Sequence, residues 1–297
     1  IKDLCATARP EVGVVTNIGV AHLRYFRTRE NLARAKAELL ESLPRRGRAV
    51  INGDDDYAEL LSGMSPCPVV RFGYSEGCEV RARDLEVDGA GRAAFTLSVK
   101  GGGRARVRLP LPGRHNVENA LAAAATEKIM GVDMECIVEG LEKAVTTGWR
   151  MEMITRPDEI TIINDAYNAN PASTRAALAV LSGLAGGRTR VAVLGDMLEL
   201  GPRAEAGHRE VGEAAARHAD YLVAVGDLSR YTAEGALAAG LPPERVFWCA
   251  DREQAAGVLQ DLLRGDELVL VKGSRGMRME EIVEALRAPH QQVEEVK

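Results

Sequence analysis

The stretch TIINDAYNANPASTRAAL, residues 161–178, predicts a strand, a polar turn and a helix in direct succession. Ile162 and Ile163 form a short apolar run of the kind found in buried strands. Pro171 suits the first position of a helix, and an Ala- and Leu-rich segment follows it. A carboxylate, a phenol and two amides lie between strand and helix, from Asp165, Tyr167, Asn168 and Asn170. Because ligands of open α/β sheets bind beyond the carboxyl ends of the strands, this stretch predicts a ligand site. For each residue taken singly, a turn or cap hydrogen bond is the alternative.

Strands and helices alternate through the rest of the second half of the chain. Strands are expected at 160–164, 190–195, 221–226, 246–248 and 267–271, and helices at 172–184, 204–218, 229–239, 252–264 and 278–287. This alternation predicts a doubly wound, Rossmann-like α/β domain. The polar loops 165–170, 195–199 and 272–276 each follow a strand, so we expect them to converge on one edge of one sheet.

The first half combines two patterns. Strands at 12–15, 48–52 and 68–73 alternate with a helix from Thr28 to about Ser42 and a short helix that starts at Gly53-Asp54, as in a parallel sheet. From Glu79 to Leu111 the sequence alternates with period two between glycine-containing turns, which predicts a small antiparallel meander. Helices are expected over 113–131 and 134–144. The segment TTGWR, residues 146–150, is predicted to be a hinge.

The composition excludes several classes of protein. A chain of 297 residues predicts about two domains. The net charge of −5, with both signs interspersed and no basic face evident, argues against nucleic acid as the main partner. No apolar run approaches the roughly 20 residues needed to cross a bilayer, so no membrane insertion is expected. The five scattered cysteines form no CxxC pair and predict reduced thiols in a cytosolic protein.

Two asparagines are candidates for nucleotide binding. Asn116 and Asn119 lie three residues apart in a predicted helix and therefore share one helix face. Amides there can donate to and accept from the polar edge of a purine. The alternative for Asn116 is a plain N-cap. Asn119 is disfavoured in a helix interior, and capping does not explain it.

Several charged residues have two possible interpretations. His22 follows a strand and Lys36 lies in the helical stretch ARAKAELL, but by residue type alone a structural His and a solvated Lys are favoured over a metal site. Arg150, in the hinge, offers a fork for phosphate oxygens or an inter-domain salt bridge. Between the last strand and the last helix, free N–H groups and fixed positive charge suit a carboxylate or a phosphate, and the residues concerned are Lys272, Ser274 and Arg275.

Six motifs, taken in order, resemble the Mur ligase family. They are TNIGVAHL, ARAKAELL, GRHNVENALAAAA, NDAYNANPASTRAAL, VLGDMLELG and VKGSRGMRME. DAYNANP and LGDMLELG resemble the branch that adds D-alanyl-D-alanine to UDP-MurNAc-tripeptide. The resemblance implies part of a central ATPase domain at 1–147, a C-terminal Rossmann-like domain at 148–288 and a tail at 289–297.

The resemblance also implies an activity and its cofactors. ATP would phosphorylate the terminal carboxylate of UDP-MurNAc-tripeptide, and the amine of D-alanyl-D-alanine would attack the acyl phosphate. The implied cofactors are ATP and Mg²⁺, and the partners are these small substrates, with the chain as a monomer. By resemblance, His22 holds magnesium, and Lys36 is the lysine that family members carbamylate into a carboxylate-like metal ligand.

The remaining roles follow the same resemblance. Asn116 and Asn119 match adenine-side asparagines, and Arg150 matches the arginine that reaches ATP on domain closure. Lys36 and Arg150 are therefore the expected catalytic residues. Asp165 matches the aspartate at the ATP ribose, with Tyr167, Asn168 and Asn170 nearby. The placement of Lys272, Ser274 and Arg275 near the incoming dipeptide is our own hypothesis, from the anion argument above.

The chain departs from the family pattern in two ways. No G-x-x-x-x-G-K-[ST] P-loop occurs, and the chain does not begin with Met, so we expect a truncated chain that does not turn over alone. After TNIGVAHL, Arg24, Arg27 and Thr28 replace the usual acidic residue and Gly-Ser pair. Two alternatives stay open: another ligase of the superfamily, such as a single-amino-acid-adding or folylpolyglutamate-type enzyme, and a non-catalytic nucleotide-binding module.

Overall fold

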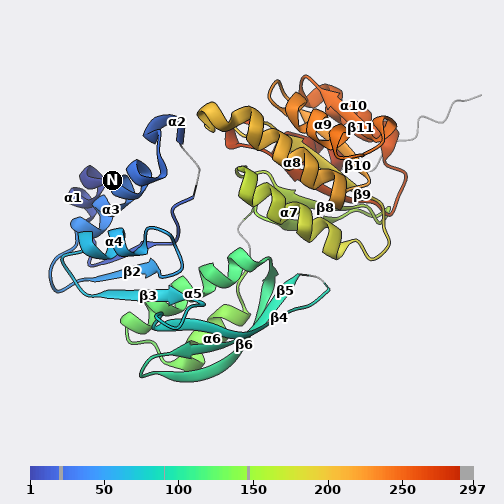
Figure 1. The fold of residues 1–297 in the computed structure, drawn as a ribbon. Helices are drawn as coiled ribbons and strands as arrows, with labels where there is room; N and C mark the ends of the chain where they lie inside the picture. Colours follow the sequence, from blue (N-terminus) through green and yellow to red (C-terminus); the bar gives the residue numbers. More distant parts are fainter. Residues whose placement is uncertain (20–22, 90, 146–147, 288–297) are drawn as a thin grey trace, which may run out of the picture. The chain divides into compact units, whose positions relative to one another are not determined.

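The computed structural model describes residues 1–19, 23–89, 91–145 and 148–287. The chain divides into two compact units, Ile1–Val145 and Thr146–Lys297, called unit 1 and unit 2 below. Each unit is built on its own six-stranded sheet (Figure 1). Among the described residues, no helix combines the length and apolarity needed to cross a bilayer.

The sheet of unit 1 changes from parallel to antiparallel along its width. Its strands lie in sequence order: β1 (Val12–Val15), β2 (Arg48–Asn52), β3 (Val69–Gly73), β4 (Val80–Val87), β5 (Arg92–Val99) and β6 (Gly103–Pro112). The pairs from β1 to β4 are parallel, and those from β4 to β6 are antiparallel. The predicted parallel part and the predicted meander are thus one continuous sheet, because Phe72 and Gly73 pair with Val80 and Arg81.

Helices cover both faces of the parallel part of this sheet and one face of the meander. They are α1 (Lys2–Ala8), α2 (Leu23–Phe26), α3 (Arg29–Glu41), α4 (Ala58–Met64), α5 (Arg114–Ile129) and α6 (Met134–Glu142). One core cluster joins α3 and α4 to β1 and β2, and another joins α5 and α6 to the meander. The prediction that a helix starts at Gly53-Asp54 was wrong. Helix α4 begins at Ala58, because the carboxylates of Asp54 and Asp55 bind backbone N–H groups of other loops instead.

Unit 2 has the predicted doubly wound sheet. The strand order is β11 (Val246–Cys249), β10 (Tyr221–Val225), β9 (Arg190–Gly195), β12 (Leu268–Lys272), β8 (Thr161–Asp165) and β7 (Glu152–Thr155). All pairs are parallel except β7 with β8. Sequence reasoning missed β7, a four-residue edge strand with no fully buried residue and hence no apolar run.

The helices of unit 2 pack on the two faces of its sheet, as in a doubly wound fold. Helices α7 (Pro171–Leu184), α8 (Ala204–His218) and α9 (Ser229–Ala238) belong to one core cluster, and α10 (Arg252–Leu262) and α11 (Glu280–Arg287) belong to the other. Figure 1 shows α7 and α8 side by side on the same face. The predicted α/β fold class is confirmed for both units. The carboxyl ends of β8, β12 and β9 are adjacent, so the loops that follow them share one edge.

Candidate functional site

Lys272 is the centre of the polar cluster at the carboxyl edge of the unit 2 sheet. It ends β12 opposite Asp165, the last residue of β8. Its side chain is almost fully buried, and Nζ donates to Asp165 Oδ2 at 2.5 Å and to the Asn168 carbonyl at 2.8 Å. This lysine therefore holds the polar turn after β8 in place, and its charge is already paired inside the protein.

Ser274 joins the three predicted loops to one another. Its Oγ accepts from Leu198 N at 2.8 Å and donates to the Ala169 carbonyl at 3.4 Å. Its own N–H donates to the Asp196 carbonyl at 3.0 Å. The predicted convergence of loops 165–170, 195–199 and 272–276 is confirmed by these contacts. Ser274 is buried, so its polar groups tie loops together instead of facing solvent.

Asp196 fixes the loop after β9 to the start of α9. Its buried carboxylate accepts from Ser229 N and Ser229 Oγ, both at 2.7 Å, and from Leu228 N at 3.2 Å. Gly226 has a φ of +107°, and a Cβ there would lie 2.7 Å from the Asp196 carboxylate, so only glycine fits. The motif LGDMLELG had signalled this loop, but not that the carboxylate caps a neighbouring helix.

His208, on α8, also contacts the loop after β9. The side chain has 0% exposure, Nε2 lies 3.0 Å from Met197 N, and Nδ1 lies 2.6 Å from the Ala204 carbonyl. This arrangement assigns the proton to Nδ1, so that Nε2 accepts from Met197. Burial lowers the pKa of His208, against opposing contributions from the Ala204 carbonyl and Asp196. Nothing in the sequence around this helical histidine distinguished it.

Arg150 lies between two residues with left-handed backbone, Trp149 (φ 64°) and Met151 (φ 53°). Such conformations are strained for bulky side chains and need outside support. Met151 N donates to Asp165 Oδ1 at 3.2 Å, and Tyr167 N donates to the Trp149 carbonyl at 3.1 Å. The Asp165 carboxylate is therefore held on one oxygen by Lys272 and on the other by the segment that carries Arg150.

The Arg150 guanidinium is stacked on an aromatic ring. Its central carbon lies 4.1 Å from the centroid of the Tyr167 ring, which itself is 44% exposed. In the described parts of the chain, no carboxylate lies within ion-pair distance of Arg150. Arg275 is stacked similarly, 4.5 Å from the Trp149 centroid, and pairs with Glu280 at 2.6 Å. These are the exposed cationic side chains of this cluster.

The two amides of the polar turn differ in what they do. Asn170 is the N-cap of α7, and its side chain accepts from Ser173 N at 2.9 Å in a capping box. The cap alternative is thus correct for Asn170, at least in part. Asn168 is exposed, and its Oδ1 accepts from the neighbouring Ala169 N at 2.9 Å. Tyr167 and Asn168 are therefore the turn residues that present side chains to solvent.

In unit 1, Asn116 and Asn119 lie together on one face of α5. Asn119 Nδ2 donates to Asn116 Oδ1 at 3.3 Å, and Asn116 Nδ2 donates to the Pro112 carbonyl at 2.8 Å. The interpretation of Asn116 as the N-cap was wrong, since Gly113 takes that position. The pair presents a flat amide edge, anchored at Asn116 and exposed at Asn119.

Lys36, on α3, lies against the loop that follows β1. Its Nζ donates to the Asn17 carbonyl at 2.8 Å. Burial lowers the pKa of Lys36, and Asp55 opposes that shift. Asp55 also fixes the loop, since its Oδ2 accepts from Ile18 N at 2.7 Å. His22, the other predicted metal ligand, lies outside the described residues.

An acidic group near this loop had not been singled out from the sequence. Burial raises the pKa of Glu118, on α5, and the charges of Asp54 and Asp55 add to the shift while Arg114 opposes it. Glu118 lies between Asn116 and Asn119 in the sequence, and the helical pattern there predicted no role for it. Within the residues that the structure describes, no three His, Cys, Asp or Glu side chains are placed to hold a metal ion.

Two family models match the chain. The Mur ligase middle domain matches residues 2–126, and the Mur ligase glutamate ligase domain matches residues 149–275. The two matches fall in unit 1 and unit 2, respectively.

Similar proteins bear one recurring name. The UDP-N-acetylmuramoyl-tripeptide–D-alanyl-D-alanine ligase of Bacillus subtilis is 34% identical over 96% of this chain and 61% of its own length. The Escherichia coli K12 protein of that name is 37% identical over 94% of this chain and 60% of its own length. Among solved structures, MurF from Acinetobacter baumannii matches with a TM-score of 0.83 and 32% identity, over 96% of this chain and 61% of that one. The chain thus spans about three fifths of the length of the relatives it matches.

Proposed function

The chain belongs to the Mur ligase family, and we propose that it serves the ATP-dependent addition of D-alanyl-D-alanine to UDP-MurNAc-tripeptide in peptidoglycan precursor synthesis. The names of its relatives support this substrate pair, as do the motifs DAYNANP and LGDMLELG. In this reaction the tripeptide carboxylate takes the γ-phosphoryl group of ATP and ADP leaves. The dipeptide amine then attacks the acyl carbon, loses a proton and displaces phosphate.

One observation supports nucleotide binding most directly: Asp165 is held from both sides by Lys272 and Met151. A carboxylate fixed in this way is preorganised to accept hydrogen bonds from ribose hydroxyls. The same contacts fix the backbone of Arg150, whose fork suits phosphate oxygens. The stacking of Arg150 on Tyr167 is a resting position that costs little to leave, because exposed cation–π contacts contribute only about 0.5–1 kcal/mol.

Each unit carries its own candidate nucleotide-binding residues. In unit 1, Asn116 and Asn119 would bind the adenine edge, since an anchored, exposed amide offers both donors and acceptors. In unit 2, Asp165 would bind the ribose with Tyr167, Asn168 and Asn170 nearby. Asn170 would act mainly through its cap of α7, which fixes the turn.

Magnesium binding would depend on a modification of Lys36. An ammonium cannot bind Mg²⁺, which takes oxygen ligands. The lowered pKa of Lys36 increases the share of neutral amine, and a neutral amine can attack CO₂ and lose a proton to give a carbamate. The carbamate oxygens, with His22, would then hold the ion that offsets the charge of the phosphates. Lys36 and Arg150 are in this sense the catalytic residues of the proposal.

The loop 272–275 would face the incoming dipeptide, with different tasks for its members. Lys272 and Ser274 are buried and bonded to neighbouring loops, so they would act by holding those loops. Arg275 is exposed and would attract the dipeptide carboxylate. We place the domains at 1–147 and 148–288, with a tail at 289–297. We also place the chain in the cytoplasm as a monomer; the free cysteines support that compartment.

ATP binding by the 297-residue chain tests the proposal. We expect Mg-ATP binding, measured by isothermal titration calorimetry, to weaken about tenfold in Arg150→Ala, as a charge-assisted hydrogen bond to phosphate is lost. Arg175→Ala is the matched control, since Arg175 lies in the same unit and pairs only with Glu210 in the structure described. Equal affinities of the Arg150→Ala and Arg175→Ala variants would remove Arg150 from the site.

The substrate assignment needs its own comparison. With Mg-ATP present, D-alanyl-D-alanine should protect the chain from proteolysis more than D-glutamate or L-alanine does. Stronger protection by a single amino acid would favour another branch of the family. ATP binding with no response to any amine would favour the non-catalytic module.

A further inference from the structure

Five arginines lie on the outward face of the sheet formed by strands β4, β5 and β6. The register pairs Arg81 and Arg104 with Ser98, and Arg83 and Arg106 with Thr96, while Arg108 pairs with Ala94. Since side chains alternate across a strand, these residues point to one side. We call this set, Arg81, Arg83, Arg104, Arg106 and Arg108, the arginine face. The sequence showed no basic face because its arginines come from two segments that only the strand register brings together.

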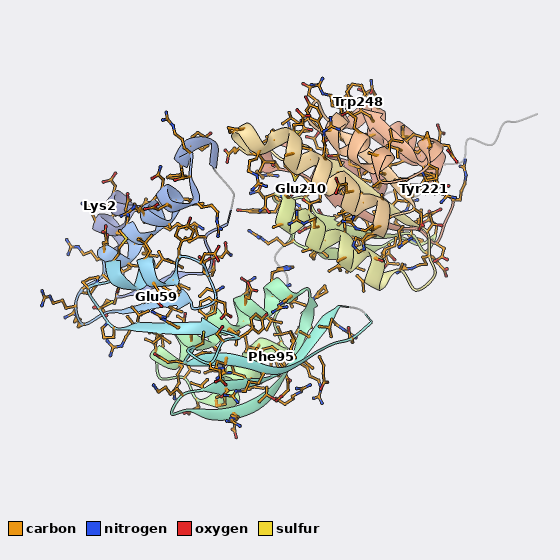
Figure 2. All side chains as sticks on the ribbon, viewed as in Figure 1. Lys2, Glu59, Phe95, Glu210, Tyr221 and Trp248 are labelled. Atoms are coloured by element: carbon orange, nitrogen blue, oxygen red, sulfur yellow. The ribbon has the colours of Figure 1, made fainter. Side chains whose placement is uncertain are left out.

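The opposite side of the same strands is fully apolar and covered. Phe95, labelled in Figure 2, is buried with Leu97 and Val107 in one core cluster with α5 and α6. Both helices therefore pack on the inner side of the meander. On the outer side, the middle strand contributes the short side chains of Ala94, Thr96 and Ser98, with Arg92 at its first position. The small residues of β5 therefore lie between the arginines of β4 and those of β6, and we call this strip the trough and its β5 residues the floor.

The dimensions of the trough follow from strand geometry. Successive arginines along β4 or β6 are about 7 Å apart, and the two rows are about 10 Å apart. An extended peptide has the same repeat of about 7 Å between alternate side chains. A segment with acidic residues at every second position would place its carboxylates at the arginine spacing.

Much of the positive charge on this face is not neutralised within the chain. Arg106 pairs with Glu86 at 2.8 Å, and Arg81 reaches Glu76 only at 3.8 Å. In the described ranges, Arg83, Arg104 and Arg108 have no carboxylate within ion-pair distance. The Nε atoms of Arg81 and Arg83 are buried and have no hydrogen-bond partner. Clustered like charges are unfavourable for folding, so an outside anion would relieve their repulsion.

A cavity of about 540 Å³ adjoins one end of the face. Arg108 of the arginine face and its pairing partner Ala94 line the cavity, and Leu109 and Pro110 add apolar lining. The acidic residues in the lining do not cancel Arg108, because Asp88 pairs with Arg92 at 2.9 Å and Glu86 pairs with Arg106. The cavity offers space for one larger side chain of a segment lying along the trough.

We propose that the arginine face docks an extended acidic segment of another protein. Arginine forks bind carboxylates and phosphates alike, so the neighbouring residues decide between partners. Nucleic acid is disfavoured because the floor holds no aromatic side chain for bases to stack on. A membrane surface is disfavoured because the outward positions carry no apolar anchor. This inference does not depend on the proposed ligase function.

The test measures binding of a fluorescently labelled Glu-Ser alternating peptide to the full chain by anisotropy. We expect affinity to fall as salt rises, and to fall about tenfold in the triple variant Arg83→Gln, Arg104→Gln, Arg108→Gln. The matched control is Arg46→Gln, Arg175→Gln, Arg203→Gln, which removes the same charge from arginines paired with carboxylates elsewhere. The control should bind as the wild type does.

Two further measurements could refute the proposal. The Gln triple variant should be as stable to heat as the wild type or more so, because it relieves like-charge repulsion. If it fails to fold, the corresponding Lys triple variant, which keeps the charge but loses the forks, should still weaken binding by severalfold. Equal loss in the control, a Gln-Ser peptide binding as well, or tighter binding of oligothymidylate or phosphatidylglycerol vesicles would each overturn the acidic-segment assignment.

Discussion

Each unit places a lysine against a loop at the carboxyl end of a parallel strand, but the two lysines have opposite surroundings. Lys272 in unit 2 is buried and directly paired with Asp165. Lys36 in unit 1 is half-buried, and within the described residues its hydrogen bond goes to the Asn17 carbonyl. A direct carboxylate partner retains an ammonium as a structural cation, whereas burial against a neutral acceptor favours loss of the proton. The same residue type thus serves as a support in one unit and as a reactive amine in the other.

The surrounding loops show the same difference. In unit 2 the three strand-end loops are bonded to one another through Ser274, while Asp196 and His208 bind the loop after β9 to α9 and α8. In unit 1 the loop after β1 is held by Asp55 and Lys36, in contacts with its backbone at Ile18 and Asn17. The unit 2 loops are therefore held by contacts within the chain, without a ligand. The following substitutions test this difference between the units, from the largest expected effect to the smallest.

The largest effect is expected from Lys272→Met. It leaves the Asp165 carboxylate largely buried without its cation, and breaking a buried pair in this way costs about 3–5 kcal/mol of unfolding free energy. Both tryptophans, Trp149 and Trp248, belong to unit 2, so fluorescence during urea unfolding reports on this unit alone. The double variant with Asp165→Asn should recover part of the loss. If the unfolding free energy of Lys272→Met lies within about 1 kcal/mol of the wild-type value, the Lys272–Asp165 pair does not stabilise the fold.

A smaller, pH-dependent effect is expected from His208. Its pKa is lowered by burial, so the unfolded chain takes up a proton at a pH where the folded chain does not. Its contribution to stability is therefore complete above pH of about 6.5 and is lost as pH falls, by at most about 1.4 kcal/mol per pH unit. His208→Gln keeps an acceptor for Met197 N and should flatten this dependence.

His218 provides the comparison for that experiment. It is half-buried on the same helix, and its pKa is also lowered, by burial and then by the charges of Arg217 and Arg190. His218→Gln should change the pH dependence less than His208→Gln does, because its imidazole is less buried and burial is the main cause of the lowered pKa in both. An unchanged slope in His208→Gln would mean that burial does not lower the pKa of His208 in the folded chain.

Sequence reasoning predicted most of the fold because most elements carry strong periodic patterns. The strands and helices of unit 2 and the meander of unit 1 follow from apolar alternation, and Thr28 and Pro171 marked helix starts correctly. What failed lacked such a signal. The edge strand β7 has no buried run, and at Asp54 the side chain binds the backbone of a distant loop, a tertiary contact that overrides local helix preference.

The site could be predicted as a set of loops but not as a set of contacts. DAYNANP, LGDMLELG and VKGSR marked three strand ends, and their convergence follows from parallel topology. That Lys272 pairs with Asp165 depends on β12 lying beside β8, a strand order that the sequence does not specify. The arginine face likewise depends on the register of β4, β5 and β6, which places residues about 20 positions apart on one surface.

The smallest change in stability and the sharpest chemical difference are expected at Lys36. Lys36→Arg should alter the unfolding free energy by less than about 1 kcal/mol, because no carboxylate is directly bonded to this side chain in the described structure. With ¹³C-labelled bicarbonate, NMR should show a carbamate signal in the wild type that is absent in Lys36→Arg. The lowered pKa means that this signal should appear at a lower pH than carbamates of exposed lysines, since more of the amine is neutral. Lys143→Arg, at an exposed lysine paired with Glu139, should keep the signal. If the signal persists in Lys36→Arg or appears only at the pH of exposed lysines, the two lysines do not differ in reactivity and the contrast between the units fails.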